Sequence, residues 1–328
     1  MVTSQHRFAE VQHISMPLSG VGITRSICLR RIWLLQKSSN IFIIIFMKTY
    51  ILAPGSYGEK VADTMSISKD GRIYTFREWE ESGKDGNILI AEKVAQDPNG
   101  ALWIIPVHNL HGMVVGKAVA AIIQQGNAVT IVGDHLLPIS HVLAAKTGWK
   151  IPEIIYSHEQ ALKQCVGALK SRYAASQLQQ NNATSGCIDT LWENDAVICA
   201  REAAIKRGLI IIDDTINPPN NETLFVVIAT TSKLDALIPQ VPMTENKTSL
   251  VNITLPDRDG SFVEILNRLN QGIGGGPSSL RWFSQLESHV KTGGTMHDVH
   301  FVYRNLDESK VTDREWIQFV PRWHRTSN

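Results

Sequence analysis

Apolar and polar positions follow one another along this chain in a pattern that predicts alternating strands and helices. Short apolar runs bounded by Gly, Pro or Asn indicate buried strands, and apolar residues three or four positions apart indicate helices packed on them. The strand pattern is clearest at 101–107, 154–156, 196–199 and 226–229, and the helix pattern at 114–125 and 202–207. This alternation is typical of an α/β protein.

The segment 151–165, IPEIIYSHEQALKQC, predicts a strand running directly into a helix. Ser157 follows the apolar strand as an N-cap, and Gln160 completes a capping box. A helix N-terminus presents unpaired N–H groups and the positive end of the helix dipole. The segment alone therefore fits either an ordinary strand–helix joint or a site for a carboxylate or phosphate.

Composition limits the classes of protein to consider. The chain has 328 residues, enough for about two domains, and it is 43% hydrophobic and 19% charged, so it can bury a sizeable core. Its net charge of +1 gives no electrostatic reason to expect nucleic acid or an anionic membrane as partner. The four cysteines form no C-x-x-C pair, which predicts reduced thiols in a cytoplasmic protein.

Residues 1–46 differ from the rest of the chain. They carry Arg7, Arg25, Arg30, Arg31 and Lys37 against the single acidic residue Glu10. The apolar run 41–46 (IFIIIF) is too short to span a bilayer. Three interpretations stay open: an extension upstream of a start at Met47, an Arg- and Ser-rich transit peptide, and a membrane anchor. The first is favoured, because Met47 directly opens the recognisable domain.

Histidines raise the question of a metal site. His108 and His111 form an H-x-x-H pair, and His135 and His141 follow in the sequence. Zinc sites need Cys or carboxylate partners at ligand spacing, and this pair lacks them. We therefore expect no metal here.

The stretch YSHEQALKQC resembles the SH-x-QA-x-x-QC segment of prephenate dehydratases, which convert prephenate to phenylpyruvate on the route to phenylalanine. Other segments of the chain resemble that family's motifs in the expected order. They are the turn PGSYG at 54–58, Pro106, Asn109 and Gly112 of a PIEN-S/T-x-x-G motif, Asp134 and His141, Thr184 and Ser185, and Thr223 and Phe225 of an N-x-TRF motif. Four positions depart from the family: His108 replaces a glutamate, Leu110 a small hydroxyl residue, Asp134 a second glutamate and Leu224 an arginine.

The resemblance implies an α/β fold. A two-lobed, periplasmic-binding-protein-like catalytic domain would be followed by an α+β ACT-like domain of the ferredoxin-like type. The implied bounds are 1–46 for the extension, 47–232 for the catalytic domain (lobe one 47–122 and 209–232, lobe two 123–208), 233–248 for a linker and 249–320 for the ACT-like domain.

The resemblance also implies roles for single residues. Thr223 would be catalytic, and the substrate-binding residues would be Ser56, Asn109, Ser157, Gln164, Thr184 and Ser185. An allosteric ligand, L-phenylalanine, would lie at Gly260, Ser261, Glu287 and Ser288 of the ACT-like domain. The substrate would be prephenate or arogenate, with no cofactor, no metal and no nucleic acid. The family further implies a homodimer or homotetramer.

Two alternatives to a prephenate dehydratase remain open on the sequence. One is a sister enzyme that decarboxylates prephenate without making the ring aromatic. The other, from a different class, is a catalytically degenerate ligand-binding or regulatory protein on the same scaffold.

Overall fold

The chain forms two compact units, Met1–Phe46 and Met47–Asn328. The structure, a computed structural model, describes residues 33–37, 40–44, 47–75, 86–148, 151–181, 188, 191–241, 248–256, 280–291, 294–304, 306 and 317–322. In the first unit, strands β1 (Trp33–Lys37) and β2 (Asn40–Ile44) pair in antiparallel fashion. None of the helices in these described ranges is both long and apolar enough to cross a membrane.

The second unit opens with a lobe built on one mixed sheet. Its strand order is β4-β3-β5-β13-β7, and β6 pairs with β5. The strands are β3 (Lys48–Ile51), β4 (Arg72–Tyr74), β5 (Ala101–Asn109), β6 (Met113–Val114), β7 (Val129–Pro138) and β13 (Glu222–Thr230). The helices are α1 (Tyr57–Thr64), α3 (Gly86–Gln96), α4 (Gly116–Gln124) and α9 (Leu234–Leu237), with single 3-10 turns at Gly126–Ala128, Thr231–Lys233 and Ile238–Gln240.

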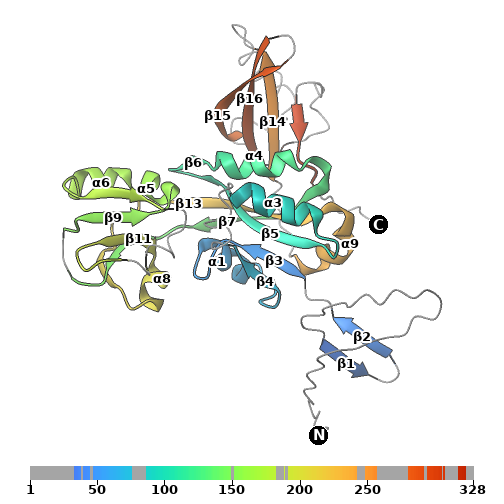
Figure 1. The fold of residues 1–328 in the computed structure, drawn as a ribbon, viewed down its shortest axis with the longest axis horizontal. Coiled ribbons are helices and arrows are strands. Elements are labelled where there is room, and N and C mark those ends of the chain that lie inside the picture. Colours follow the sequence, from blue (N-terminus) through green and yellow to red (C-terminus); the bar gives the residue numbers. More distant parts are fainter. Residues whose placement is uncertain are drawn as a thin grey trace, which may run out of the picture. The chain divides into compact units, whose positions relative to one another are not determined.

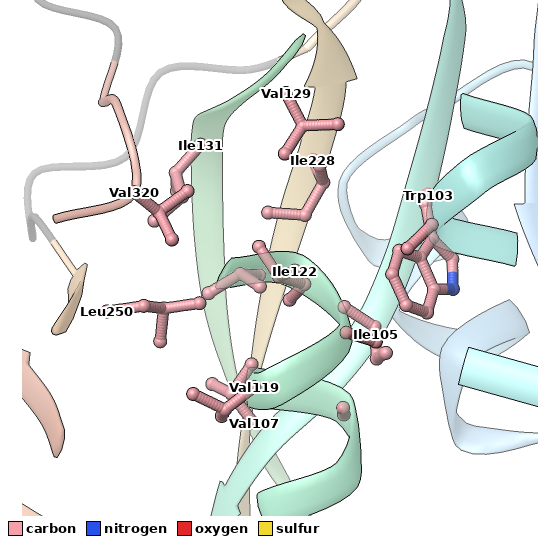
Figure 2. Close-up of a cluster of buried hydrophobic side chains, with 14 of the residues drawn as sticks. Trp103, Ile105, Val107, Val119, Ile122, Val129, Ile131, Ile228, Leu250 and Val320 are labelled. Carbon is pink, nitrogen blue, oxygen red and sulfur yellow. The ribbon is translucent and has the colours of Figure 1, made fainter. Parts of the chain in front are cut away.

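Helices cover both faces of this sheet. On one face, α3 and α4 pack against alternate residues of β5 and β13, including Trp103, Ile105 and Ile228 (Figure 2). On the other face, Val61 of α1 and Leu237 of α9 pack against the intervening residues of the same strands. Because successive side chains of a strand point to opposite faces, the near-continuous apolar runs of β5 and β13 bury residues on both sides.

The second lobe is a five-stranded sheet of order β10-β9-β11-β8-β12. Its strands are β8 (His141–Ala145), β9 (Ile154–Ser157), β10 (Gln177–Gln180), β11 (Ala196–Ala200) and β12 (Ile210–Asp213). Helices α5 (Glu159–Gln164) and α6 (Val166–Arg172) cover one face and α8 (Arg201–Lys206) packs on the other. In Figure 1 these elements lie together, apart from the sheet of the first lobe.

The strands divide between the lobes differently from the bounds inferred from the sequence. Val129–Pro138 pairs with β13 and so belongs to the first sheet, although 123–208 was expected to form lobe two. Ile210–Asp213 pairs with β8 and so belongs to the second sheet, although 209–232 was expected in lobe one. Two short connections, 139–140 and 214–221, therefore join the lobes. Strand pairing is non-local, and local apolar patterns do not reveal it.

Ser157 does not cap the helix that follows it. It is the last residue of β9, and its hydroxyl donates to the carbonyl of Ile198 on the neighbouring strand, at 2.8 Å. His158 is the N-cap instead, and its Nδ1 accepts from the backbone N–H of Gln160. The predicted capping box between Ser157 and Gln160 was wrong, because the strand continues for one more residue than its apolar run.

A third sheet follows, with strands β14 (Thr248–Pro256), β15 (Leu280–Lys291), β16 (Gly294–Arg304) and β17 (Ile317–Phe319). All pairs are antiparallel, and the order is β15-β16-β14-β17. This sheet fits the ferredoxin-like arrangement expected for the region. The expected helix at 262–269 lies outside the described residues, as do Gly260 and Ser261, whereas Glu287 and Ser288 belong to β15.

The third sheet shares a core with the first lobe. Leu250, Val302 and Val320 pack in the same apolar cluster as Ile122 of α4 and Ile131 of β7 (Figure 2). The buried carboxylate of Asp134 on β7 accepts from the backbone N–H and the hydroxyl of Thr248, at 2.9 and 2.6 Å. Apolar burial and charge-assisted hydrogen bonds thus both hold the start of β14 against the first lobe.

Candidate active site

A cavity of about 280 Å³ lies among elements of both lobes. Most of its lining is apolar and includes Ile104, Pro106, Ile139 and Phe225. Its polar lining residues are Ser56, Tyr57, Asn87, Asn109, His141, His158, Gln160, Gln164 and Thr223, and two cationic residues, Lys206 and Arg207, come from the end of α8. An apolar cavity with a few convergent polar groups is the usual form of a small-molecule site.

Thr223 and Asn109 lie directly opposite each other on β13 and β5. The Asn109 Nδ2 lies 2.8 Å from the Thr223 hydroxyl oxygen, and Asn109 Oδ1 accepts from the backbone N–H groups of His111 and Gly112, at 2.9 and 2.6 Å. These two bonds settle which end of the amide is the donor. Because the threonine oxygen is the acceptor, its own O–H is left as a donor toward the cavity.

Asn221 continues this network to the second lobe. Its Oδ1 accepts from Asn109 Nδ2 at 2.7 Å, and its Nδ2 donates to Gln164 Oε1 on α5 at 3.0 Å. The same Gln164 oxygen lies 2.8 Å from Nε2 of His141, at the start of β8. With two donors on its oxygen, Gln164 keeps its NH₂ group as the donor available to a ligand.

Burial controls the protonation of the groups around this network. It lowers the pKa of His141 to about 4, so this imidazole is neutral near pH 7, and it raises the pKa of the Tyr57 phenol. Burial also raises the pKa of the Cys199 thiol to about 12, which leaves this cavity-lining cysteine protonated and a poor nucleophile. The groups around this network are therefore neutral, and the charged lining residues are Lys206 and Arg207 at the end of α8.

Ser56 lies at the cavity wall and caps α1. Its hydroxyl accepts from the N–H of Glu59 at 3.3 Å, and the Glu59 carboxylate accepts from the N–H of Gly55 at 2.7 Å. The arrangement resembles a capping box, except that the carboxylate accepts from Gly55, the residue before the N-cap. Tyr74 also donates to that carboxylate, and Arg72 lies 3.8 Å from it. The N-terminus of α1 thus already has an internal anion beside it.

The structure brings some of the predicted site residues together and not others. Asn109, Gln164, Thr223 and Ser56 all line the cavity. Ser157 is fully buried, and its hydroxyl is occupied by a strand carbonyl. Thr184 and Ser185 lie outside the described residues.

Two of the departures from the family motifs, His108 and Leu224, are buried and do not line the cavity. Leu224 is 3% exposed and packs in the core cluster of α3 and α4, whereas its neighbours Thr223 and Phe225 line the cavity. In the strand pairing, Leu224 stands directly opposite His108, which is also buried. The glutamate and the arginine of the family motifs would be cross-strand neighbours at these two positions, so the two departures are a matched pair.

Sequence reasoning missed several residues of the site. Asn221 begins the N-x-T motif and could have been singled out there, and His141 was noted only as a motif match. Tyr57 and Gln160 stood within the quoted motifs, but neither was singled out as a site residue. Among the residues that the structure describes, no three His, Cys, Asp or Glu side chains are grouped as metal ligands.

The fold and the site define a class of protein: a two-lobed α/β domain with a ligand cavity lined by residues of both lobes, followed by an antiparallel sheet. The family model for prephenate dehydratase matches residues 53–233, which is more than half of the chain and includes Asn109, Gln164 and Thr223. The chain belongs to the prephenate dehydratase family.

Comparisons with single proteins agree with this assignment. A prephenate dehydratase of Lactococcus lactis subsp. lactis (strain IL1403) is 27% identical over 217 residues, which cover 64% of this chain and 72% of that protein. The crystal structure of a prephenate dehydratase from Arthrobacter aurescens, in complex with L-Phe, matches with a TM-score of 0.51 and 19% identity over 85% of this chain and 90% of that one. A prephenate dehydratase from Staphylococcus aureus subsp. aureus Mu50 matches with a TM-score of 0.51 and 18% identity, covering 84% and 99% of the two chains. The two structural likenesses confirm the expected two-lobed fold.

Proposed function

We propose that this protein is an active prephenate dehydratase with its site in the interlobe cavity. The observation that carries the proposal is the Asn109–Thr223 pair: a threonine hydroxyl whose oxygen accepts from a fixed amide, on the wall of an apolar cavity. Membership of the family supports it. The departures at His108 and Leu224 do not weaken it, because both side chains are buried and neither lines the cavity.

The reaction needs orientation more than strong acid or base groups. In prephenate the bond between the ring and its carboxylate breaks, and its electron pair enters the ring. The ring C–O bond breaks at the opposite carbon, and hydroxide leaves. With one proton taken up, the products are phenylpyruvate, CO₂ and water. The gain of an aromatic ring drives both bond cleavages, so the protein must mainly hold the dianion and assist the leaving hydroxide.

The cavity residues fit these tasks. We propose that the Thr223 O–H donates to the departing hydroxyl while Asn109 supports its oxygen. The NH₂ group of Gln164 is free to bind a substrate carboxylate, since its oxygen is occupied by His141 and Asn221. The apolar lining excludes water from the ring and strengthens each of these hydrogen bonds.

The other predicted roles remain proposals. Thr184 and Ser185 are proposed as further carboxylate ligands from the resemblance alone. Ser56 would contribute its backbone and the shape of the wall, because its hydroxyl is used to cap α1. Ser157 would support the strand end that carries His158. We further propose that the third sheet belongs to an ACT-like domain that binds L-phenylalanine, as the Arthrobacter aurescens relative is crystallised with that ligand.

The test is to add prephenate to the full chain and follow phenylpyruvate by its ultraviolet absorbance in alkali. Thr223→Ala should reduce kcat by roughly 10²-fold or more, because a positioned donor in the transition state is lost. Thr223→Ser keeps the hydroxyl and should retain most of the activity. Cys199→Ala, which also lines the cavity, serves as a size-matched control.

The alternatives give different results in the same assay. Prephenate consumed without phenylpyruvate would identify the non-aromatising decarboxylase. If prephenate is left unchanged and arogenate is converted to phenylalanine, the substrate is arogenate. If neither compound reacts but phenylpyruvate or phenylalanine binds, the protein is a ligand-binding homologue.

A further inference from the structure

Asn221 lies where the two connections between the lobes meet. The first connection, 139–140, joins β7 to β8, and the second, 214–221, joins β12 to β13. Asn220 has φ +54°, a left-handed conformation that asparagine tolerates better than most residues. This sharp turn precedes the buried side chain of Asn221, which is 3% exposed.

Asn221 binds both connections to each other. Its backbone carbonyl accepts from the N–H of Ile139 at 2.8 Å, in the first connection. Its Nδ2 donates to Oδ1 of Asn217 at 2.9 Å, in the second. Asn217 in turn donates to the carbonyl of Ile139 at 2.9 Å and accepts from the N–H of His141 at 3.2 Å. Asn217 and Asn221 thus hold the two connections between the lobes together by hydrogen bonds.

Asn221 differs from Asn217 because it also contacts the site. Its Oδ1 accepts from Asn109 in the first lobe, and its Nδ2 donates to Gln164 in the second, at 2.7 and 3.0 Å. One buried amide thus orients two other amides that face the same cavity from different lobes. Asn109 Nδ2 lies near three oxygens, and its two shortest contacts are to Asn221 and Thr223, at 2.7 and 2.8 Å, with the Glu222 carbonyl at 3.0 Å. Asn221 therefore helps to fix the Asn109 amide that contacts Thr223, and it binds the oxygen end of the Gln164 amide.

We propose that Asn221 is a positioning residue that sets the relative placement of the two lobes' ligand-binding amides, and through Asn109 the orientation of the Thr223 hydroxyl. This inference rests on the proposed function for its kinetic consequence, but its structural consequence does not depend on any activity. Misplacing a reacting group by about 1 Å costs a factor of roughly 10² in rate, so loss of Asn221 should affect kcat more than KM.

The kinetic experiment compares Asn221→Leu with Asn217→Leu. Both substitutions replace an asparagine of the second connection by an apolar residue of similar size. Both also remove hydrogen bonds that involve the connections. Only the first removes the bonds to Asn109 and Gln164. Asn221→Leu should lower kcat for phenylpyruvate formation on the order of 100-fold and change KM by a few fold at most. Asn217→Leu should lower kcat by roughly tenfold less than Asn221→Leu, because Asn217 contacts neither Asn109 nor Gln164 and holds Asn221 by a single hydrogen bond.

The structural experiment uses hydrogen exchange and needs no substrate. The N–H groups of His111 and Gly112 both donate to Asn109 Oδ1, so their exchange reports how firmly Asn109 is held. Asn221→Leu should speed their exchange roughly tenfold, the effect of weakening one hydrogen bond, and Asn217→Leu should leave it unchanged. If Asn221→Leu does not fold, Asn221→Asp keeps the acceptor for Asn109 and loses the donor to Gln164, and it should lower kcat while the two amides keep their slow exchange.

The outcomes separate this inference from the proposed function. Unchanged exchange at His111 and Gly112 in folded Asn221→Leu would overturn the inference whatever the activity. Equal losses of kcat in Asn221→Leu and Asn217→Leu would also overturn the inference, because Asn221 would then only hold the two connections together. Faster exchange in Asn221→Leu would support the structural part of the inference. If the wild-type chain were at the same time inactive on prephenate, only the dehydratase proposal would be contradicted.

Discussion

Leu224 and His108 face each other across β13 and β5, and neither side chain lines the cavity. Leu224→Arg, which restores the family residue, should therefore not increase activity. It would place an unpaired cation in an apolar cluster and lower the free energy of unfolding by roughly 3–5 kcal/mol. Urea unfolding of the variant would measure this loss.

Two further variants test whether volume and charge at these two positions explain the loss of stability. Leu224→Met conserves volume and should cost less than about 1.5 kcal/mol. Adding His108→Glu to Leu224→Arg should recover part of the loss, because the two side chains would pair across the strands. A single Leu224→Arg variant that is both stable and more active would show that position 224 reaches the substrate.

His141 should make the protein sensitive to acid. Burial lowers its pKa to about 4 from an ordinary 6.5, so the unfolded chain binds a proton that the folded chain refuses. The stability is therefore complete above about pH 6.5 and declines as the pH falls toward 4, by a total on the order of 3 kcal/mol. Urea unfolding at pH 7 and at pH 4.5 would measure the decline.

The variant His141→Gln supplies the control for this acid sensitivity. It cannot take up a proton, so its loss of stability between the two pH values should be smaller than that of the wild type. Burial also lowers the pKa of His158, and that contribution is present in both proteins. Equal acid losses in the two proteins would mean that His141 is not the group responsible.

At the scale of elements, α5 approaches the turn after β5 very closely. A Cβ added at Gly112 would lie 2.9 Å from Oε1 of Gln160, 3.2 Å from Cγ of Gln164 and 3.3 Å from Oδ1 of Asn109. The Gln160 amide can move aside, but Gln164 and Asn109 belong to the site. Gly112→Ala should therefore lower kcat/KM roughly tenfold or more with a stability cost of only about 1–2 kcal/mol, measured in the phenylpyruvate assay and by thermal unfolding.

Gly167 is the matched position on the next helix. It lies in α6, is exposed, and a Cβ there would meet no atom within 4 Å. Gly167→Ala should leave activity unchanged and raise the stability by up to about 1 kcal/mol, because alanine loses less backbone entropy in a helix. Similar losses of activity in both variants would contradict the importance of the α5 contact.

The apolar pattern predicted six elements of the two lobes to within a few residues, namely β5, β9, β11, β13, α4 and α8, but it gave no sign of β4, α3 or α9. It failed where a strand's end is set by its neighbours. Ser157 has the side chain of a helix cap, yet the pairing of β9 with β11 and β10 extends the strand through it. Likewise the mostly polar segment Gln177–Gln180 forms the exposed edge strand β10, because main-chain pairing does not require apolar side chains.

At the scale of the whole 47–328 unit, the third sheet and the first lobe share one core. Leu250 on β14 is fully buried with Ile122 and Val119 of α4 (Figure 2). Leu250→Ala should cost about 2–5 kcal/mol and speed hydrogen exchange in α4, which lies on the sheet that carries the site. Leu255→Ala removes a side chain of the same size from the other core of the third sheet, and it should leave α4 protected. Unchanged exchange of α4 in Leu250→Ala would show that the two parts unfold independently.

The sequence by itself determined the alternation of strands and helices, because this depends on the local spacing of apolar residues. It also determined the family and singled out Asn109, Gln164 and Thr223, because these can be recognised from short motifs. Only the tertiary structure decided that Asn109 and Thr223, 114 positions apart, bond each other. It also decided that Leu224 packs in the core instead of lining the cavity and that Asn221 joins the two lobes. The physical reason is that local pattern sets the period of an element. Strand order and register depend instead on which apolar faces can be buried together, and this involves residues far apart in the chain.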